Sequence, residues 1–190
     1  MVARTGAGMG DDGGVERKRG SQTARDMTLS MLVILLGAGL VYLFIPHDDS
    51  LDPVRPISYD MELVTARRAA PYPVAAPVGL PGTWRATSVE YEARSDHGAA
   101  WHLGFMDPEN EYAAVEQSDG RPAPFIDEVT HGAEPTGRTQ TIDGRKWTRY
   151  EGPKYDALVL EEKAVTTVVT GTAPFDSLAR LAASLEARKG

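Results

Sequence analysis

Histidine is the side chain best suited to acid–base chemistry and metal binding near neutral pH, and the chain has four histidines. They are His47, His97, His102 and His131. No H-E-x-x-H motif contains them, so we predict no metal site. We interpret His102, which follows Trp101 in a predicted strand, as an ordinary position in a sheet. Two further histidines, His97 and His131, lie beside glycines, and we interpret them as turn residues.

Ser118 is the best candidate for a nucleophile, because it ends a predicted strand. It lacks the flanking glycines of a nucleophile elbow, and we interpret Ser118 and Asp119 as residues that cap a turn. The adjacent carboxylates Glu161 and Glu162 would point to opposite faces of a strand, so they cannot act together as an acid–base pair. We therefore predict no catalytic residues, no cofactor and no enzymatic activity.

A binding surface is the alternative role for polar side chains near these strand ends. Polar groups beside aromatic rings are common in recognition sites. Two stretches have this character, and our candidate binding patch consists of Glu116, Gln117, Ser118, Asp119, Trp147, Tyr150 and Glu151. In the competing interpretation the aromatic residues belong to the core, because large aromatic side chains are usually buried.

Seven strands are predicted to position these residues. Their ranges are 85–93, 100–106, 112–117, 138–142, 145–150, 157–160 and 165–170. Asp143 and Gly144 between two of them are typical of a type I′ hairpin turn. Helices are predicted at 57–70, at 123–130 and from Pro174 to Lys189, and residues 71–81 form an extended, proline-rich segment. Because the strands follow one another without alternating helical crossovers, residues 57–190 are predicted to form an antiparallel α+β domain with packed helices.

An uncharged apolar segment runs from Met27 to Ile45, ahead of this domain. As a helix it would span about 30 Å, the thickness of the hydrocarbon core of a bilayer. We therefore predict a transmembrane helix over 27–45, with the lipid bilayer as its partner. The segment is preceded by Arg17, Lys18, Arg19 and Arg25 and followed by acidic residues. The positive-inside rule then predicts a cytoplasmic amino terminus and extracytoplasmic residues 46–190.

The flanks of the apolar segment have simple compositions. Residues 1–26 are rich in glycine and have no apolar periodicity, which predicts a disordered cytoplasmic tail. Residues 46–56 form a polar linker. A cleaved signal peptide is the alternative, but its apolar region would be shorter and would end in a small-x-small site, whereas this segment ends in Phe44, Ile45 and Pro46. We predict an uncleaved, single-pass anchor in the plasma membrane.

Charge and cysteine content exclude several classes of function. The net charge is −7, and 15 basic and 23 acidic side chains follow residue 26. An acidic domain of this kind is a poor partner for nucleic acid. The chain has no cysteine, which excludes disulfides, thiolate catalysis and a lipid-modified cysteine.

Several short stretches together resemble a known family. They are TARDM (23–27), APYPV (70–74), LPGTWR (80–85), WHLG (101–104), EQSD (116–119), WTRYE (147–151) and VVTGT (168–172). As a set they resemble the actinobacterial DUF4245 proteins, a family of unknown function, from about residue 23 to the end. The resemblance implies a single-pass protein of the cell envelope and carries no catalytic assignment.

Three hypotheses of function follow from the sequence. The first is a non-catalytic envelope module that binds a protein or cell-wall partner. The second is an envelope hydrolase, which the absence of a nucleophile–base motif disfavours. The third is a sensor or regulator that acts through a membrane partner, since residues 1–26 are too short for a folded cytoplasmic domain.

Overall fold

The structure is a computed structural model that describes residues 20–44 and 57–190. Within the first range, the side chains of residues 25–39 are described. The predicted linker at 46–56 and residues 1–19 of the predicted tail lie outside the described residues. The two described ranges belong to separate compact units, so each is treated by itself.

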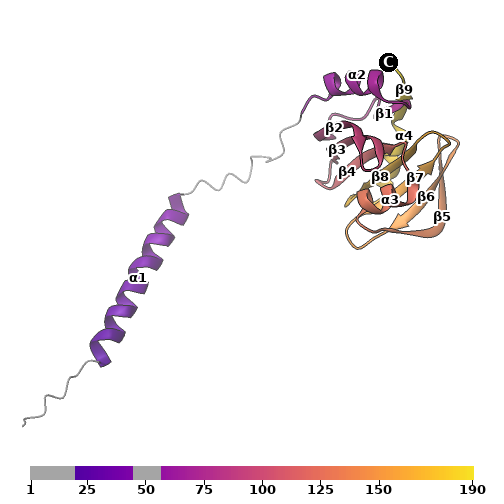
Figure 1. The fold of residues 1–190 in the computed structure, drawn as a ribbon. Coiled ribbons are helices and arrows are strands. Elements are labelled where there is room, and N and C mark those ends of the chain that lie inside the picture. Colours follow the sequence, from indigo (N-terminus) through magenta and orange to yellow (C-terminus); the bar gives the residue numbers. More distant parts are fainter. Residues whose placement is uncertain (1–19, 45–56) are drawn as a thin grey trace, which may run out of the picture. The chain divides into compact units, whose positions relative to one another are not determined.

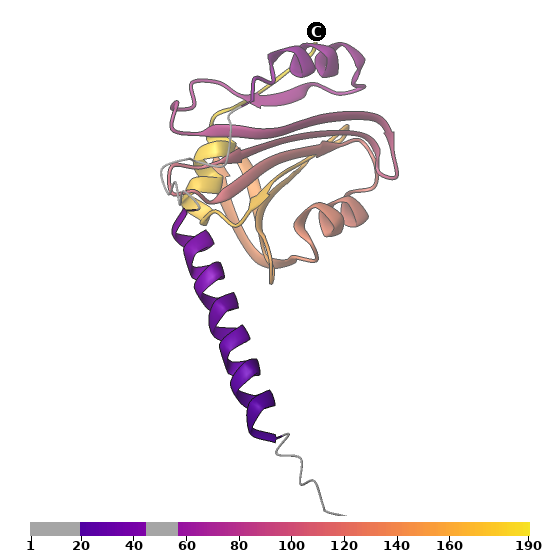
Figure 2. The same cartoon turned by 90° about the vertical axis from the view of Figure 1, so that its left-hand side faces the viewer.

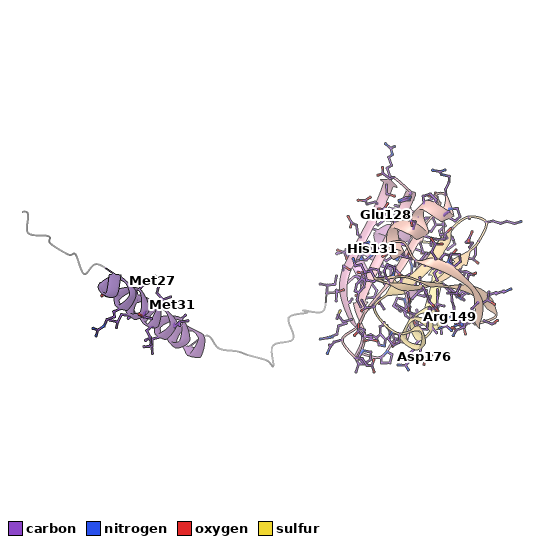
Figure 3. All side chains as sticks on the ribbon, turned by 90° about the horizontal axis from the view of Figure 1, so that it is seen from below. Met27, Met31, Glu128, His131, Arg149 and Asp176 are labelled. Carbon is purple, nitrogen blue, oxygen red and sulfur yellow. The ribbon has the colours of Figure 1, made fainter. Side chains whose placement is uncertain are left out.

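Helix α1 (Gly20–Phe44) covers nearly all of the predicted apolar segment and begins before it. Over residues 25–39, where its side chains are described, the large apolar side chains are exposed, among them those of Met27 and Met31, which project from the ribbon in Figure 3. The helical conformation predicted for this segment is present up to Phe44, whereas its predicted crossing of a membrane stays a prediction. Among the residues whose side chains are described, 25–39 and 57–190, no helix is long and apolar enough to cross a membrane.

Residues 57–190 form an antiparallel α+β domain, as predicted (Figure 1). The larger sheet has the order β2-β3-β4-β8-β7-β6-β5. Its strands are β2 (Arg85–Ser95), β3 (Gly98–Met106), β4 (Tyr112–Ser118), β5 (Glu134–Ile142), β6 (Arg145–Glu151), β7 (Asp156–Glu161) and β8 (Thr166–Gly171). Every neighbouring pair is antiparallel, and each of the seven predicted strands is present. The two hairpin series, β2-β3-β4 and β5-β6-β7-β8, meet where β4 pairs with β8.

Local signals explain two of the connections. Asp143 and Gly144 both have positive φ between β5 and β6, as the type I′ turn requires. Helix α3 (Pro122–Thr130) begins at a proline and is followed by the C-cap residue His131, whose φ of 56° is left-handed. Both features agree with the predicted hairpin and the predicted helix at 123–130.

The two faces of the large sheet are covered by different elements. On β8, Val169 packs into the larger core while Val168 packs against Phe125 and Ile126 of α3. Neighbouring residues of a strand point to opposite faces, so the larger core and α3 lie on opposite sides of the sheet. Helix α4 (Phe175–Ala183) contributes Leu178 and Leu181 to the larger core. We call this side the core face and the α3 side the open face.

A second, smaller layer completes the core face. Helix α2 (Asp60–Ala69) and strand β1 (Val74–Pro77) lie along one side of the long β2–β4 strands (Figure 2). The predicted helix at 57–70 is thus confirmed with slightly shorter bounds. Gln117 of β4 joins the layers, because its side chain accepts a hydrogen bond from the Ala75 backbone N–H at 2.7 Å and donates to Thr167 Oγ1 at 3.0 Å.

The predicted carboxyl-terminal helix is wrong beyond Ala183. Residues Leu185–Arg188 form strand β9, which pairs with β1 in a two-stranded antiparallel sheet. Strand β1 is buried, so its backbone groups need partners within the protein. The β9 backbone supplies them. The requirement to pair a buried strand therefore outweighs the helix propensity of Leu185, Glu186 and Ala187.

Candidate functional site: an acidic pocket on the open face

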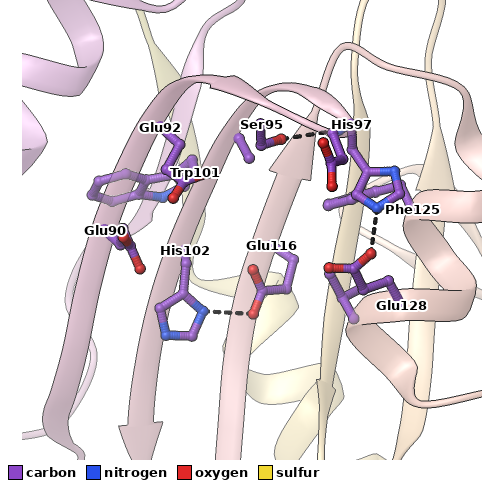
Figure 4. Close-up of a pocket in the computed structure, with 12 residues that line it drawn as sticks. Glu90, Glu92, Ser95, His97, Trp101, His102, Glu116, Phe125 and Glu128 are labelled. Atoms are coloured by element: carbon purple, nitrogen blue, oxygen red, sulfur yellow. Dashed lines mark hydrogen bonds and ion pairs between the residues drawn. The ribbon is translucent and has the colours of Figure 1, made fainter.

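One pocket of the described residues lies between the β2–β3 hairpin, strand β4 and helix α3 (Figure 4). Its volume is about 270 Å³. The charged and titratable side chains that line it are Glu90, Glu92, Asp96, His97, His102, Glu116 and Glu128. No lysine or arginine is among the described residues that line the pocket. Five carboxylates therefore surround a small cavity with only histidines to neutralise them.

The register of the sheet determines which side chains meet at the centre of the pocket. Glu90 of β2 pairs with His102 of β3, and His102 pairs with Glu116 of β4. Directly paired residues in adjacent antiparallel strands project from the same face, about 4.5–5.5 Å apart at their Cβ atoms. Three neighbouring strands thus build one row of acid, histidine and acid across the open face.

His102 and Glu116 form a close pair. The distance from His102 Nδ1 to Glu116 Oε1 is 2.6 Å, and the side chains are 28% and 12% exposed. Burial alone would lower the pKa of His102, but the hydrogen bond to Glu116 and the charges of Glu116 and Glu90 raise it above its ordinary value. Burial also raises the pKa of Glu116, and His102 offsets part of that shift. The pair therefore retains its shared proton to higher pH than a free histidine would.

The other ring nitrogen of His102 faces a serine. His102 Nε2 lies 2.7 Å from Ser88 Oγ. Gly104 makes this contact possible, since a Cβ there would lie 2.4 Å from Ser88 Oγ. The result is a hydrogen-bonded chain of three side chains, Ser88, His102 and Glu116, on the open face.

A second histidine–carboxylate pair forms another wall of the pocket. His97 Nε2 in the β2–β3 turn lies 2.5 Å from Glu128 Oε2 on α3. The His97 ring also packs on Phe125, with ring centroids 5.9 Å apart. Figure 4 shows the two pairs as separate dashed contacts on different sides of the pocket. The open face thus holds two similar acid–histidine pairs, one within the sheet and one between the sheet and α3.

Ser118 has a structural role. It is buried, donates a hydrogen bond to the His97 carbonyl and accepts one from the Gly120 N–H at 2.9 Å. Gly120 must be a glycine for this close approach, because a Cβ there would lie 2.0 Å from the His97 carbonyl oxygen. Asp119 Oδ1 accepts from the Ala99 N–H at 2.8 Å. These contacts agree with the interpretation of Ser118 and Asp119 as turn-capping residues, and they hold His97 in place.

The structure does not bring the seven residues of the candidate patch onto one surface. Glu116 lines the acidic pocket, whereas Gln117 and Trp147 are fully buried in the core face. Tyr150 is half-buried against the α3 cluster, and Glu151 is exposed at the end of β6. Only Glu116 of the seven therefore contributes to the pocket.

Glu90, Glu128 and Ser88 were not among the residues predicted to form a site. Two of them carried a usable signal, because Ser88 and Glu90 are alternate residues of a predicted strand and share a face with His102 once the hairpin register is known. Glu128 carried none, since its position depends on how α3 packs. Metal binding finds no support in the described residues, which contain no group of three or more ligands that could hold an ion.

Fold and site together define a class of protein: an antiparallel α+β domain that carries an acidic, histidine-lined pocket on one face of its sheet. The chain belongs to the DUF4245 family, described as proteins of unknown function, whose family model matches residues 19–185. The predicted family is thereby confirmed. No curated protein matches the chain.

Proposed function

We propose that this chain is a membrane-anchored, extracytoplasmic binding module without catalytic activity, and that its acidic pocket takes a positively charged group of a cell-envelope partner. The observation that carries the proposal is the lining of the pocket. Five carboxylates and two histidines face one cavity, with no basic residue among its described lining. Such concave clusters of one sign of charge attract ligands of the opposite sign.

The chemistry of the pocket favours an organic cation. Ala100, Phe125 and Val129 add apolar surface between the carboxylates. An alkylammonium or guanidinium group on an aliphatic chain uses both kinds of surface, because the charged group can reach a carboxylate while the methylene groups cover apolar atoms. A basic side chain of a partner protein and an amine of a cell-wall component both have this chemistry.

The anchor is supported by the sequence of residues 27–45. This segment is uncharged and lies within a region that is helical up to Phe44. The proposed topology follows from the basic residues before it and the acidic residues after it. Anchored in this way, residues 57–190 would meet partners outside the cytoplasmic membrane.

Calorimetric titration of the full-length chain in zwitterionic detergent micelles tests the binding proposal, with spermidine as the cationic probe. We expect saturable binding that weakens with salt, because the contacts are between charges. Glu90→Gln should weaken binding by about two- to fivefold, the value of one partly exposed ion pair. Glu62→Gln, at an exposed position of α2, is the matched control and should leave the affinity unchanged. Equal affinities of all three proteins would contradict the proposal.

A serine hydrolase is the second candidate, and one observation favours it. Ser88, His102 and Glu116 are connected in the order of a catalytic triad, with Nε2 toward the hydroxyl and Nδ1 toward the carboxylate. In that role Ser88 Oγ would attack a carbonyl carbon while its proton passed to Nε2. However, Ser88 does not line the acidic pocket.

A fluorophosphonate probe separates the two candidates. A binding module should show no adduct by intact-mass analysis of the full-length protein. An adduct on wild type that disappears in Ser88→Ala and in His102→Ala would establish the hydrolase instead. Ser184→Ala is the control for nonspecific labelling, because Ser184 caps α4 and lies outside the acidic pocket.

A further inference from the structure

The exposed apolar side chains of the domain belong to its first elements. Among the described residues 57–190, the large aliphatic and aromatic side chains that are exposed are Ile57, Met61, Val64 and Val78. All four precede β2, in the segment that contains α2 and β1. Residues 79–190 bury or half-bury every side chain of this kind. Within the described domain, only this segment therefore presents large apolar side chains to solvent.

Helix α2 is apolar on two opposite faces. Leu63 and Ala66 are buried and pack into the core. At about 100° per residue, Met61, Val64 and Arg68 lie together on the opposite face. Met61 is 78% exposed and Val64 is 47% exposed. A helix on the surface of a soluble domain is ordinarily polar on its outward face, so the outward face of α2 is suited to an apolar partner.

Thr65 completes this surface, which we call the α2 outer face and which consists of Met61, Val64, Thr65 and Arg68. The Thr65 hydroxyl donates to the Met61 carbonyl at 2.9 Å, so its polar group is satisfied within the helix. An apolar strip that ends in a guanidinium group is typical of a helix that lies at a lipid surface. There the apolar side chains enter the acyl boundary while the charged group stays among the headgroups.

The charge balance around α2 also differs from that of the rest of the domain. Residues 57–78 and 185–190, which contain α2, β1 and β9, have four basic and three acidic side chains. Residues 79–184 have 10 basic and 17 acidic side chains. Anionic lipid headgroups repel an acidic surface. The layer that contains α2 is therefore the part of the domain that a negatively charged membrane would repel least.

The chain connects this layer directly to the predicted anchor. Fifteen residues separate Phe44, at the end of α1, from Asp60, at the start of α2. Fully extended, fifteen residues span at most about 50 Å. A membrane that holds residues 27–45 is thus always within reach of α2, and the tether gives even a weak lipid contact a high effective concentration. This continuity favours lipid over a separate partner as the occupant of the α2 outer face.

We infer that the α2 outer face lies on the surface of the membrane that anchors the chain, with Met61 and Val64 in the acyl boundary and Arg68 at anionic headgroups. This inference depends on the anchor of the proposed function and adds a second lipid contact to it. The acidic pocket lies on the open face, whereas α2 belongs to the layer on the core face (Figure 1). A domain held through α2 would therefore leave the pocket accessible to partners outside the membrane.

Fluorescence quenching tests this contact in the full-length chain, which has no native cysteine. Met61→Cys, labelled with the dye NBD, is reconstituted into vesicles of three parts phosphatidylcholine and one part phosphatidylglycerol. A nitroxide near the top of the phosphatidylcholine acyl chain should quench at least about half of the fluorescence, because interfacial helices lie about 5–10 Å into this region. Asp127→Cys, at an exposed position of α3, is the control and should keep its fluorescence.

Two further variants separate the effect of the helix face from that of the dye. With NBD at Met61→Cys, the double substitution Val64→Glu and Arg68→Glu places two carboxylates on the α2 outer face and should abolish the quenching. Arg121→Glu with Ala123→Glu, at the start of α3, changes the net charge equally and should preserve it. All four positions are exposed, so both variants should keep the thermal midpoint of the labelled parent.

The inference and the proposed anchor fail in different ways. If alkaline carbonate extracts the full-length chain from the vesicles, the anchor of the proposed function is wrong. If the chain stays in the membrane and the dyes at Met61→Cys and Asp127→Cys are quenched equally, the lipid contact is wrong and the anchor stands. Protection of the Met61→Cys dye from aqueous iodide without quenching by the nitroxide lipid would mean that protein covers the α2 outer face, and it would also overturn the inference.

Discussion

Glu116 is the residue on which the pocket depends most. Its carboxylate is 12% exposed and lies between two neighbouring strands, with His102 as its hydrogen-bond partner. A carboxylate so far from water is stable as an anion only beside a compensating charge. The same residue is exposed to ligand through the cavity that it lines. Glu116 therefore connects the hydrogen-bonded chain of the open face to the binding site.

The first prediction concerns the proton on His102. The midpoint of its ring-proton titration by NMR should lie above 6.5, because Glu116 and Glu90 hold the imidazolium. In Glu116→Gln the midpoint should fall below that of wild type, since burial then acts without the opposing carboxylate. A midpoint that is unchanged by the substitution would contradict the assigned pair. His131, which contacts Lys154 instead, serves as the internal control.

The free energy of unfolding of the domain should depend on the protonation of His102. A raised pKa in the folded state means that the folded protein holds a proton that the unfolded chain has released. The contribution of this proton to the free energy of unfolding is fully present below the pKa of His102 in the unfolded chain, about 6.5. It is lost as the pH rises through the pKa of His102 in the folded protein. Urea unfolding of wild type should therefore show a decline in the free energy of unfolding above pH 6.5, and His102→Gln should show a smaller decline. An equal decline in both proteins would contradict this assignment.

At the scale of elements, Gln117 joins two sheets. Its amide satisfies the Ala75 N–H of β1 and Thr167 of β8, and the side chain is 1% exposed. Gln117→Ala should lower the free energy of unfolding by about 3 kcal/mol, from an unpaired buried N–H and a new cavity. Thr167→Val removes only one partner of the amide and should cost about 1 kcal/mol. Denaturant unfolding measures both, and equal losses would show that the Ala75 contact does not matter.

The elements divide into those that local sequence determines and those that it does not. Asp143 and Gly144 specify their hairpin locally, because positive φ at both positions selects the turn type. Strand β9 could not be predicted, since Leu185, Glu186 and Ala187 favour a helix and only the buried β1 makes them a strand. The predicted patch failed to assemble for a related reason. Gln117 and Trp147 lie on the core face, while Glu116 lies on the open face, and alternation along β4 separates Gln117 from Glu116.

Part of the pocket could have been predicted from the sequence. The row of Glu90, His102 and Glu116 follows from strand alternation once the two hairpin registers are known. The bulge between Ala86 and Ser88 shifts that register, and nothing in the sequence marks it clearly. His97 and Glu128 are 31 residues apart, and their contact depends on the packing of α3 over the sheet. Long-range packing, rather than local preference, made this part of the site unpredictable.

At the scale of the whole molecule, the proposed topology can be tested with cysteine labelling, because the chain has no native cysteine. A membrane-impermeant maleimide added to intact cells should label Glu62→Cys, in the proposed extracytoplasmic domain. It should label Thr5→Cys only after the membrane is permeabilised. Labelling of Thr5→Cys in intact cells, with Glu62→Cys protected, would reverse the proposed orientation.

Chemical-shift mapping is the most direct test of whether the acidic pocket binds an organic cation. Isotope-labelled full-length protein in micelles would be titrated with spermidine while backbone amide signals are recorded. We predict saturable shifts that concentrate at Glu90, His97, His102, Glu116 and Glu128. Shifts spread evenly over exposed carboxylates such as Glu62 and Glu186, or no saturable shift at all, would contradict the account.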